Sequence, residues 1–162
     1  MIQAKKLGHL VLKVRDARAS RDFYTKTLGL KVAHEDLDRG AVFLSFGVQH
    51  HDLALFQLAT GERPGATQPG LHHTAWQLGS FAELQAAYRE LGQLGITVES
   101  TIEHNVTRSI YFHDPDDNRV ELYCDMVEDG FDAMRTMGPR RDELDIETGT
   151  IVGGAPPSEA SL

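Results

Sequence analysis

The chain has 162 residues, of which 41% are hydrophobic, and its formal net charge at pH 7 is -8. This length lies within the range of a single domain, and the hydrophobic fraction is large enough to supply a core. The negative charge and the absence of a basic run argue against nucleic acid or an anionic membrane as a partner, because either polyanion would be repelled. A small-molecule ligand is the better expectation.

No stretch of the sequence reaches the roughly 18 consecutive apolar residues that a membrane-spanning helix needs. The N-terminus also lacks the apolar core of a signal peptide. Cys124 is the only cysteine, so an intrachain disulfide cannot form, as is typical of proteins from a reducing compartment. These features predict a cytoplasmic protein that has no membrane partner.

Two halves of the sequence repeat one pattern. The first half opens with LGHLVLKV at residues 7–14, and the second opens with LHHTAWQL at residues 71–78. Each half continues through a helical stretch to a similar exit, LGLKV at residues 28–32 and LGITV at residues 94–98. Self-similarity at a long period indicates a repeated structural unit. The two prolines and three glycines of residues 61–70 mark the break between the halves.

Each half is predicted to contain one helix followed by short strands. The first helix, about Ala17 to Leu28, has a possible N-cap at Asp16 and ends at Gly29. The second helix begins with a capping-box pattern at Ser80 and repeats apolar residues at spacings of three and four. The β-rich runs after the helices are 32–34, 41–46 and 52–58 in the first half, and 97–100, 109–112 and 119–123 in the second.

The repeated β-α-β-β-β pattern predicts an α+β fold in which two tandem modules curl their sheets into a cup around a metal site. We expect a single domain over residues 1–124, with module one at 5–60 and module two at 70–124. Residues 125–162 depart from the repeat and are expected to form a C-terminal extension. This extension is predicted to contain a short helix around Glu128 to Met137 and then a mobile tail.

Two histidines and a glutamate occupy positions in this cup that suit metal binding. Side chains alternate across a strand, so His9 in the first strand and His73 in its repeat equivalent should face one another, with Glu121 beside them. Two imidazoles and one carboxylate form the facial triad of non-haem Fe(II) enzymes, which leaves coordination positions open. Zinc, manganese or nickel can use the same ligands. Either histidine alone would be read as structural, but the repeat and Glu121 favour metal ligation.

From residue 7 to about residue 124 the chain resembles the vicinal oxygen chelate superfamily, and within it the type I extradiol catechol dioxygenases. The Leu-Gly-His opening at His9 and the second histidine of the His72-His73 pair are similar to two of the family's ligand-bearing segments. The run SIYFHDPDDNRVELY at residues 109–123 is similar to the third. Its Asp-Pro turn, followed by Asn-Arg and a glutamate, is the most specific of the three motifs.

The resemblance implies that Fe(II) is held by His9, His73 and Glu121, with Mn(II) as a possible substitute, and that a catechol and O2 are the substrates. A homodimer or a higher homo-oligomer is the default expectation for such a chain. Asp117 stands where the family usually has glycine. Aspartate tolerates a positive φ better than most residues, so we expect the turn to persist.

Three further residues point to the dioxygenase branch of the superfamily. His51 resembles its acid-base histidine, and Tyr111, ten residues before Glu121, resembles its substrate-binding tyrosine. His104 is the best match to a second histidine that contacts substrate. His51 alternates in phase with Leu53 and is therefore expected to face the cup. The remaining histidines are read as surface or packing residues: His34, His50, His72 and His113.

The repeat also helps to separate the candidate activities. Pairing Phe43 of the first module with Tyr111 of the second places Leu53 opposite Glu121, so the first module offers no fourth ligand. Glyoxalase-type isomerases resemble this fold but generally take a fourth ligand from that position. Extradiol ring cleavage is therefore the favoured function. The alternatives are a metal-dependent isomerase or thiol transferase of the same superfamily, and a metal-free binding protein.

Overall fold

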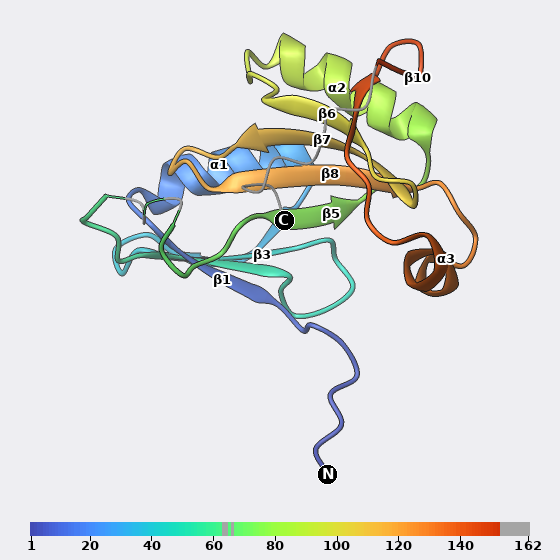
Figure 1. Cartoon of the computed structure of the whole chain (residues 1–162). Coiled ribbons are helices and arrows are strands. Elements are labelled where there is room, and N and C mark those ends of the chain that lie inside the picture. The colour runs from blue at the N-terminus through green and yellow to red at the C-terminus, as the bar shows by residue number, and fades with distance from the viewer. Residues whose placement is uncertain (63–64, 66, 153–162) are drawn as a thin grey trace. The chain divides into compact units, whose positions relative to one another are not determined.

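The computed structural model describes residues 1–62, 65 and 67–152 (Figure 1). The described chain contains two β-sheets and three α-helices, which confirms the predicted α+β class. It divides into two compact units. The first comprises Met1–Gly70 and Asp114–Asp117, and the second comprises Leu71–His113 and the chain from Asn118 onward. No helix among the described residues is long and apolar enough to cross a membrane.

The first unit is built on a four-stranded sheet with one helix. Its elements are β1 (Leu10–Val14), α1 (Ala17–Leu28), β2 (Lys31–Asp36), β3 (Ala41–Ser45) and β4 (Leu53–Gln57). The strand order is β1-β4-β3-β2, with β1 parallel to β4 and the other neighbours antiparallel. Val14, Tyr24, Leu44 and Leu55 are fully buried and form part of its core.

Helix α1 has the ends that its sequence predicts. The Asp16 carboxylate accepts hydrogen bonds from the backbone N–H groups of Arg18 and Ala19, at 2.8 and 3.0 Å. These bonds satisfy donors that have no partner inside the helix. At the other end Gly29 adopts the left-handed conformation with φ 67°. Glycine favours this conformation because it has no Cβ.

The turn Asp114–Asp117 groups with the first unit through buried polar contacts. The Tyr24 hydroxyl donates to Asp114 Oδ2 at 2.8 Å, and the Arg15 guanidinium donates to Asp116 Oδ1 at 2.9 Å. Asp117 has φ 64°, so the expectation that aspartate accepts the glycine-like position of this turn is confirmed. The Asp-Pro-Asp-Asp sequence therefore supplies both the turn and its attachment to α1.

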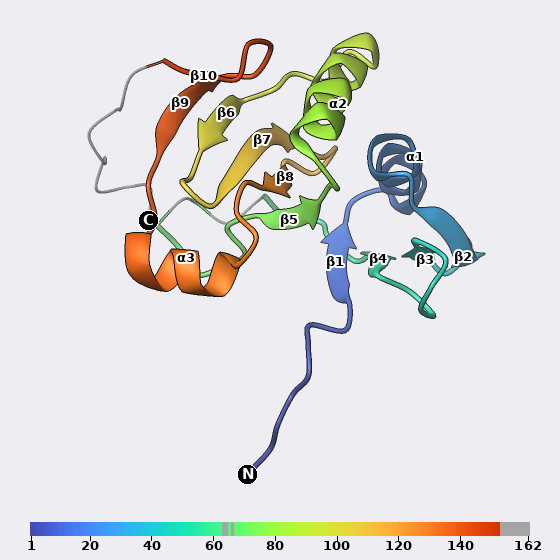
Figure 2. The same ribbon diagram turned by 90° about the vertical axis from the view of Figure 1, so that its right-hand side faces the viewer.

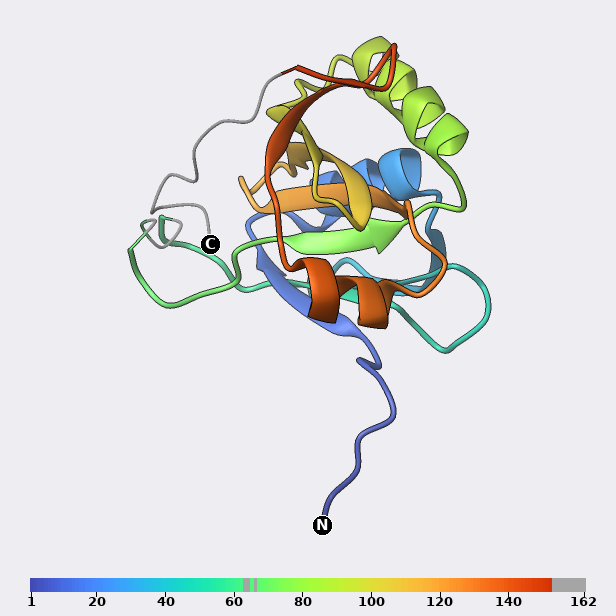
Figure 3. The same cartoon turned by 45° about the vertical axis from the view of Figure 1, so that its right-hand side comes forward.

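The second unit is built on a six-stranded sheet. Its elements are β5 (Thr74–Gln77), α2 (Phe81–Gln93), β6 (Ser100–Glu103), β7 (Thr107–His113), β8 (Arg119–Asp125), α3 (Gly130–Met137), β9 (Asp142–Asp145) and β10 (Thr150–Ile151). The strand order is β10-β9-β6-β7-β8-β5, and only the β5–β8 pair is parallel. Figures 2 and 3 show α2 and α3 on opposite sides of this sheet.

The C-terminal extension contains more structure than its sequence predicts. The expected short helix is present as α3, but β9 and β10 were not predicted. β9 has the acidic sequence Asp-Glu-Leu-Asp, yet Asp142 and Leu144 are buried because the strand pairs with β6. β6 itself lies at residues 100–103 rather than 97–100. The predicted mobile tail from residue 153, and residues 63, 64 and 66 of the break between the halves, lie outside the described residues.

Candidate active site

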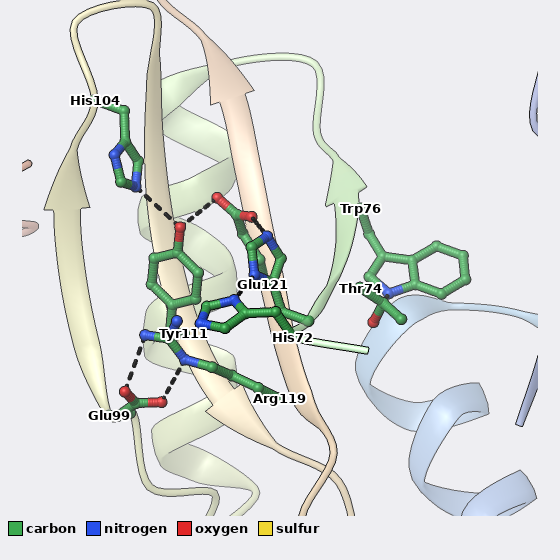
Figure 4. A network of polar contacts seen from close by, with 9 residues as sticks. His72, Thr74, Trp76, Glu99, His104, Tyr111, Arg119 and Glu121 are labelled. Carbon is green, nitrogen blue, oxygen red and sulfur yellow. Dashed lines mark hydrogen bonds and ion pairs between the residues drawn. The ribbon is translucent and has the colours of Figure 1, made fainter. Parts of the chain in front are cut away.

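A line of polar contacts crosses the second sheet (Figure 4). Tyr111 on β7 pairs in register with Glu121 on β8, and the Tyr111 hydroxyl donates to Glu121 Oε1 at 2.8 Å. His104 Nε2 lies 2.9 Å from the Tyr111 hydroxyl oxygen. His73, which immediately precedes β5, places its Nε2 2.9 Å from Glu121 Oε2. The second unit therefore brings together four of the six predicted site residues.

The strand register explains why these side chains meet. Directly paired residues on neighbouring strands project to the same side of a sheet, so Tyr111 and Glu121 must share a face. Ala75 pairs with Glu121 across the parallel β5–β8 ladder, which brings the start of β5, and with it His73, next to the glutamate. In Figure 4 helix α2 lies behind the strands and the network lies in front. The network therefore occupies the sheet face opposite α2.

The surroundings set the protonation states of Glu121 and Tyr111. Glu121 is only 7% exposed, and burial alone would raise its pKa, but hydrogen bonds from His73 and Tyr111 outweigh burial and lower the pKa. Burial, followed by the charge of Glu121, raises the pKa of Tyr111. At neutral pH the pair is thus a carboxylate beside a neutral phenol. An ionised carboxylate can serve as a metal ligand, and a neutral phenol can donate a hydrogen bond.

Arg119 holds the Tyr111 ring in place, a role that sequence reasoning missed. Its guanidinium lies 4.0 Å from the centroid of the Tyr111 ring, within cation–π range. Two hydrogen bonds, of 2.8 and 2.9 Å, fix the same guanidinium to the Glu99 carboxylate. The signal in the sequence was the spacing of two residues between Arg119 and Glu121, which puts both on one face of β8.

The first unit gathers three histidines at the ends of its strands. His9 immediately precedes β1, and His50 and His51 lie in the loop between β3 and β4. The His9 and His51 ring centroids are 4.3 Å apart, and the Nδ1 atoms of His50 and His51 are 2.6 Å apart. Loss of hydration, followed by the charges of His9 and His50, lowers the pKa of His51. His51 is therefore neutral at pH 7 and able to accept a proton.

The register of the first sheet corrects two sequence-based expectations. Phe43 pairs with Ala54, whereas Tyr111 pairs with Glu121, so Ala54 and not Leu53 is the counterpart of the glutamate. The paired residues are eleven positions apart in the first unit and ten in the second, so the two hairpins differ by one residue between equivalent pairs. Ala54 is fully buried and has no ligand atom.

The strand phase assigned to His51 was also wrong. β4 begins at Leu53, so His51 belongs to the preceding loop and does not continue the alternation of the strand. Its ring centroid lies 5.3 Å from that of Phe43, which shares a sheet face with Ala54. His51 thus meets His9 through the loop and not through strand alternation.

The donor chemistry of the second unit fits a divalent transition metal. The His73 nitrogen and the Glu121 oxygen are 2.9 Å apart, and the carboxylate is held in its ionised form. Imidazole nitrogen and carboxylate oxygen are common ligands of Fe(II), Mn(II) and Zn(II). No group of three or more His, Cys, Asp or Glu side chains in the described part of the chain has the arrangement of a complete metal site. His9, the third predicted ligand, belongs to the first unit.

Comparison with known proteins shows that this chain is similar to proteins named as dioxygenases. Over 128 residues it is 37% identical to biphenyl-2,3-diol 1,2-dioxygenase 2 of Rhodococcus globerulus, covering 77% of this chain and 65% of that relative. Biphenyl-2,3-diol 1,2-dioxygenase 3 of the same organism is 32% identical, with 98% of this chain and 88% of the relative covered. The chain thus spans slightly less than two thirds of the first relative and most of the second.

A solved structure supports the fold. The glyoxylase/bleomycin resistance protein/dioxygenase domain from Frankia sp. EAN1pec superposes with a TM-score of 0.61 at 21% identity, covering 78% of this chain and 96% of that one. The profile of the Glyoxalase/Bleomycin resistance protein/Dioxygenase superfamily matches residues 6–122. That match includes the Tyr111–Glu121 pair and all the predicted site residues. The chain belongs to the Glyoxalase/Bleomycin resistance protein/Dioxygenase superfamily.

Proposed function

We propose that this protein is an Fe(II)-dependent extradiol dioxygenase that opens the ring of a catechol with O2. The observation that carries the proposal is the contact of His73 with Glu121 beside the Tyr111 hydroxyl and His104. Two metal-ligand groups and two groups able to bind a substrate hydroxyl thereby share one sheet face. The relatives named as biphenyl-2,3-diol dioxygenases support a vicinal aromatic diol as the substrate class.

His9, His73 and Glu121 would hold the metal as two neutral imidazoles and one carboxylate. Fe(II), when bound, supplies open positions at which a catechol and O2 are oriented together and through which electron density passes between them. Before metal binds, hydrogen bonds from His73 and Tyr111 lower the pKa of Glu121 and keep it ionised, and the Tyr111 hydroxyl can continue to donate to Oε1 afterwards. Ala54 offers no donor at the equivalent position of the first unit, which supports three protein ligands and not four.

Tyr111 and His104 are assigned to the substrate. The raised pKa of Tyr111 keeps its hydroxyl protonated, so it can donate a hydrogen bond to a catechol oxygen. Arg119 fixes the plane of the Tyr111 ring and thus the direction in which that hydroxyl points. His104 can accept the proton of a catechol hydroxyl and hold the charge that develops on the diol.

His51 is assigned the proton transfers on the oxygen side of the reaction. Its lowered pKa leaves the imidazole neutral at pH 7, so it can take up a proton and return it later. His9 lies beside His51 in the first unit, so the same unit supplies a predicted ligand and the acid-base group. The family resemblance assigns the same role to this histidine.

The experiment is anaerobic reconstitution with Fe(II), followed by exposure to air with catechol, 3-methylcatechol or 2,3-dihydroxybiphenyl. A yellow ring-opened product is expected, and its rate of formation ranks the three substrates. Metal-free protein and protein loaded with Zn(II) are the controls and should form no product. Lack of reaction with every diol, together with one tightly bound Mn, Zn or Ni per chain, would instead support an isomerase or thiol transferase of the same superfamily.

A further inference from the structure

The connection between α3 and β9 reaches the site through a main-chain group. The carbonyl oxygen of Arg140, in this connection, lies 2.8 Å from His104 Nδ1. The neighbouring Asn105 side-chain amide donates to the carbonyl oxygen of Gly138 at 3.4 Å. The turn that carries His104 is thus in contact with residues 138–140 of the C-terminal extension.

The carbonyl of Arg140 is held in position by the adjoining strand β9 and the chain beyond it. β9 pairs with β6, matching Glu103 with Asp142, so the connection is attached directly beside His104. The Leu144 side chain is buried, and the Thr101 hydroxyl donates to the Leu144 carbonyl oxygen at 2.5 Å. The extension is therefore fixed to the sheet.

A side chain of α2 fixes the extension at a second place. The Gln85 amide donates to the carbonyl oxygens of Ile146 and Glu147, at 2.9 and 3.0 Å. Ile146 is itself buried, at 4% exposed. The chain on the C-terminal side of Arg140 is thus attached to both the sheet and α2, which limits how far the carbonyl can move away from His104.

This contact determines which nitrogen of His104 carries hydrogen. A carbonyl oxygen can only accept a hydrogen bond, so Nδ1 must be the protonated nitrogen whenever the bond to Arg140 is formed. In neutral His104 the lone pair then resides on Nε2, which lies 2.9 Å from the Tyr111 hydroxyl oxygen. The accepting nitrogen of the imidazole is thereby directed at the site.

The network lacks one proton when His104 is neutral. Nε2 of neutral His104 and the Glu121 carboxylate both accept, and the Tyr111 hydroxyl between them has a single hydrogen to donate. If a further proton arrives at Nε2, imidazolium donates to the Arg140 carbonyl and to the Tyr111 oxygen, and the single Tyr111 hydrogen is donated either to Glu121, as in this structure, or to an oxygen of the bound diol. Every member then has a partner. The hydroxyl of a bound diol is a source of that proton.

We propose that residues 138–141 are a positioning element of the active site, because the Arg140 carbonyl holds His104 in the Nδ1-protonated tautomer that accepts a proton from the diol. This inference rests on the proposed function and assigns a part in it to the C-terminal extension. The carbonyl does not touch the substrate and acts only through His104. In the absence of this contact His104 would be free to rotate or to adopt the other tautomer.

The first test reads the tautomer directly and needs neither metal nor substrate. In protein labelled with 15N-histidine at about pH 8.5, where an imidazole of ordinary pKa is neutral, long-range 1H–15N spectra distinguish the two tautomers. His104→Phe identifies the resonance by its loss. The native chain should show His104 protonated at Nδ1, and insertion of one glycine between Arg140 and Arg141 should remove that signature.

A matched control lengthens the other connection of α3. One glycine inserted between Val127 and Glu128 adds the same length to the extension but lies outside residues 138–140, which make the contacts with His104 and Asn105, so the Nδ1-protonated signature should persist. Pro139→Gly is a second variant that loosens residues 138–141 without adding length, in case the insertion prevents folding. Nε2 protonation in the native chain, or a signature unaffected by both Arg140–Arg141 insertion and Pro139→Gly, would overturn the proposal.

The second test separates action through His104 from a general structural effect. His104→Phe is expected to lower kcat by about 100-fold. In the native background the insertion after Arg140 should lower kcat roughly 10- to 100-fold, as displacement of a catalytic group does. In the His104→Phe background the same insertion should hardly change kcat. An equal loss in both backgrounds would contradict the proposal. If the native protein opened no diol, the proposed function would fail. The tautomer measurement would still show whether the Arg140 carbonyl sets the tautomer of His104.

Discussion

The two sheets carry different chemistry at the same register position. In the first unit the pair on the central antiparallel strands is Phe43 with Ala54, and in the second it is Tyr111 with Glu121. The strand pairing around them is alike: β1 runs parallel to β4, and β5 runs parallel to β8. The two units therefore share one strand arrangement, and only the second has polar side chains, Tyr111 and Glu121, at this position.

The units also differ in whether the polar side chains of interest lie in a loop or inside paired strands. In the first unit His50 and His51 are in the β3–β4 loop, outside the alternation of either strand. In the second unit Tyr111 and Glu121 are inside paired strands, and their spacing is fixed by the ladder. Strand positions are thus set by register, whereas loop positions are set by local contacts such as that of His51 with His9.

The largest effect is expected from Glu121→Gln, which makes the second unit more like the first by removing its charge. The neutral amide is a poor ligand for Fe(II), so turnover should fall by at least about 1,000-fold and iron content should fall with it. The measurements are kcat/KM for 2,3-dihydroxybiphenyl and bound iron per chain after anaerobic reconstitution.

Glu103→Gln is the matched control for that substitution. Glu103 is as buried as Glu121, but its carboxylate pairs with Arg108 at 2.7 Å, outside the network of His73 and Tyr111. Its loss should lower stability and leave iron content intact. If Glu121→Gln retained full iron and turnover, the assignment of Glu121 as a ligand would be wrong.

A smaller effect on activity is expected from Tyr111→Phe, which gives the second unit the aromatic residue of the first. The substitution removes the hydroxyl that contacts Glu121 and His104 while keeping the ring beside Arg119. We expect a loss of about 100-fold in kcat/KM with unchanged iron content, because the hydroxyl is assigned to substrate and not to metal. Tyr88→Phe on α2 is the control. Parallel loss of iron and activity would show that Tyr111 acts on the metal site instead.

We expect the buried hydroxyl of Tyr24 to stabilise the first unit. Tyr24→Phe would leave the Asp114 carboxylate without the hydroxyl that donates to it at 2.8 Å. The free energy of unfolding should fall by about 1–3 kcal/mol, the usual cost of removing one partner from a buried hydrogen bond. Urea denaturation of the two proteins at pH 7 measures the difference. Unchanged stability would exclude this bond as the attachment of the Asp114–Asp117 turn.

The same substitution should change how stability depends on alkaline pH. Burial, followed by the charge of Asp114, raises the pKa of Tyr24 well above its ordinary value. Because the folded-state pKa is raised, the unfolded chain releases this proton at a lower pH than the folded chain does. The stabilisation is therefore complete below about pH 10 and declines as pH rises through the folded-state pKa. Native protein should therefore lose stability more steeply than Tyr24→Phe above about pH 10. Equal slopes would contradict the prediction.

The smallest effect is expected at the glycines that follow α1 and α2, a feature that the two units share. Gly29 after α1 and Gly95 after α2 have φ 67° and 72°, and at neither would an added Cβ meet another atom within 4 Å. Alanine at either position should therefore cost only the strain of the left-handed conformation, about 1–2 kcal/mol. Thermal unfolding of Gly29→Ala and Gly95→Ala should show similar losses. Markedly different losses would show that the helix ends are not equivalent.

The sequence predicted helices α1 and α2 and the strand that carries Glu121 because their signals are local, whereas His9 and His73 each fall one residue before the strand predicted to carry them. Asp16 and Gly29 mark the ends of α1, and Tyr111 and Glu121 share a face because of the ladder they form. The Leu53 assignment failed because Phe43 and Ala54 are one position further apart than Tyr111 and Glu121, and a strand pattern does not show this. β9 was missed because an acidic tetrapeptide does not suggest a buried strand, although Leu144 is buried.

Other parts of the site have no signal that a single sequence can carry. The group that orients His104 is a main-chain carbonyl, and every residue has one, so the identity of Arg140 gives no indication of the contact. In the sequence Arg119 is only part of the Asn-Arg motif, and its contact with the Tyr111 ring depends on where the fold places its guanidinium. Contacts made by the backbone, or by the charged end of a long side chain, depend on tertiary structure.

The fate of the oxygen atoms of O2 during turnover tests the proposed extradiol dioxygenase activity most directly. Protein reconstituted with Fe(II) would be given 2,3-dihydroxybiphenyl under 18O2, and the product analysed by mass spectrometry. The ring should open beside the diol, with 18O from O2 in the new carboxylate, and Glu121→Gln should form no product. Conversion of the diol without incorporation of 18O, or cleavage between the two hydroxylated carbons, would contradict extradiol dioxygenase activity.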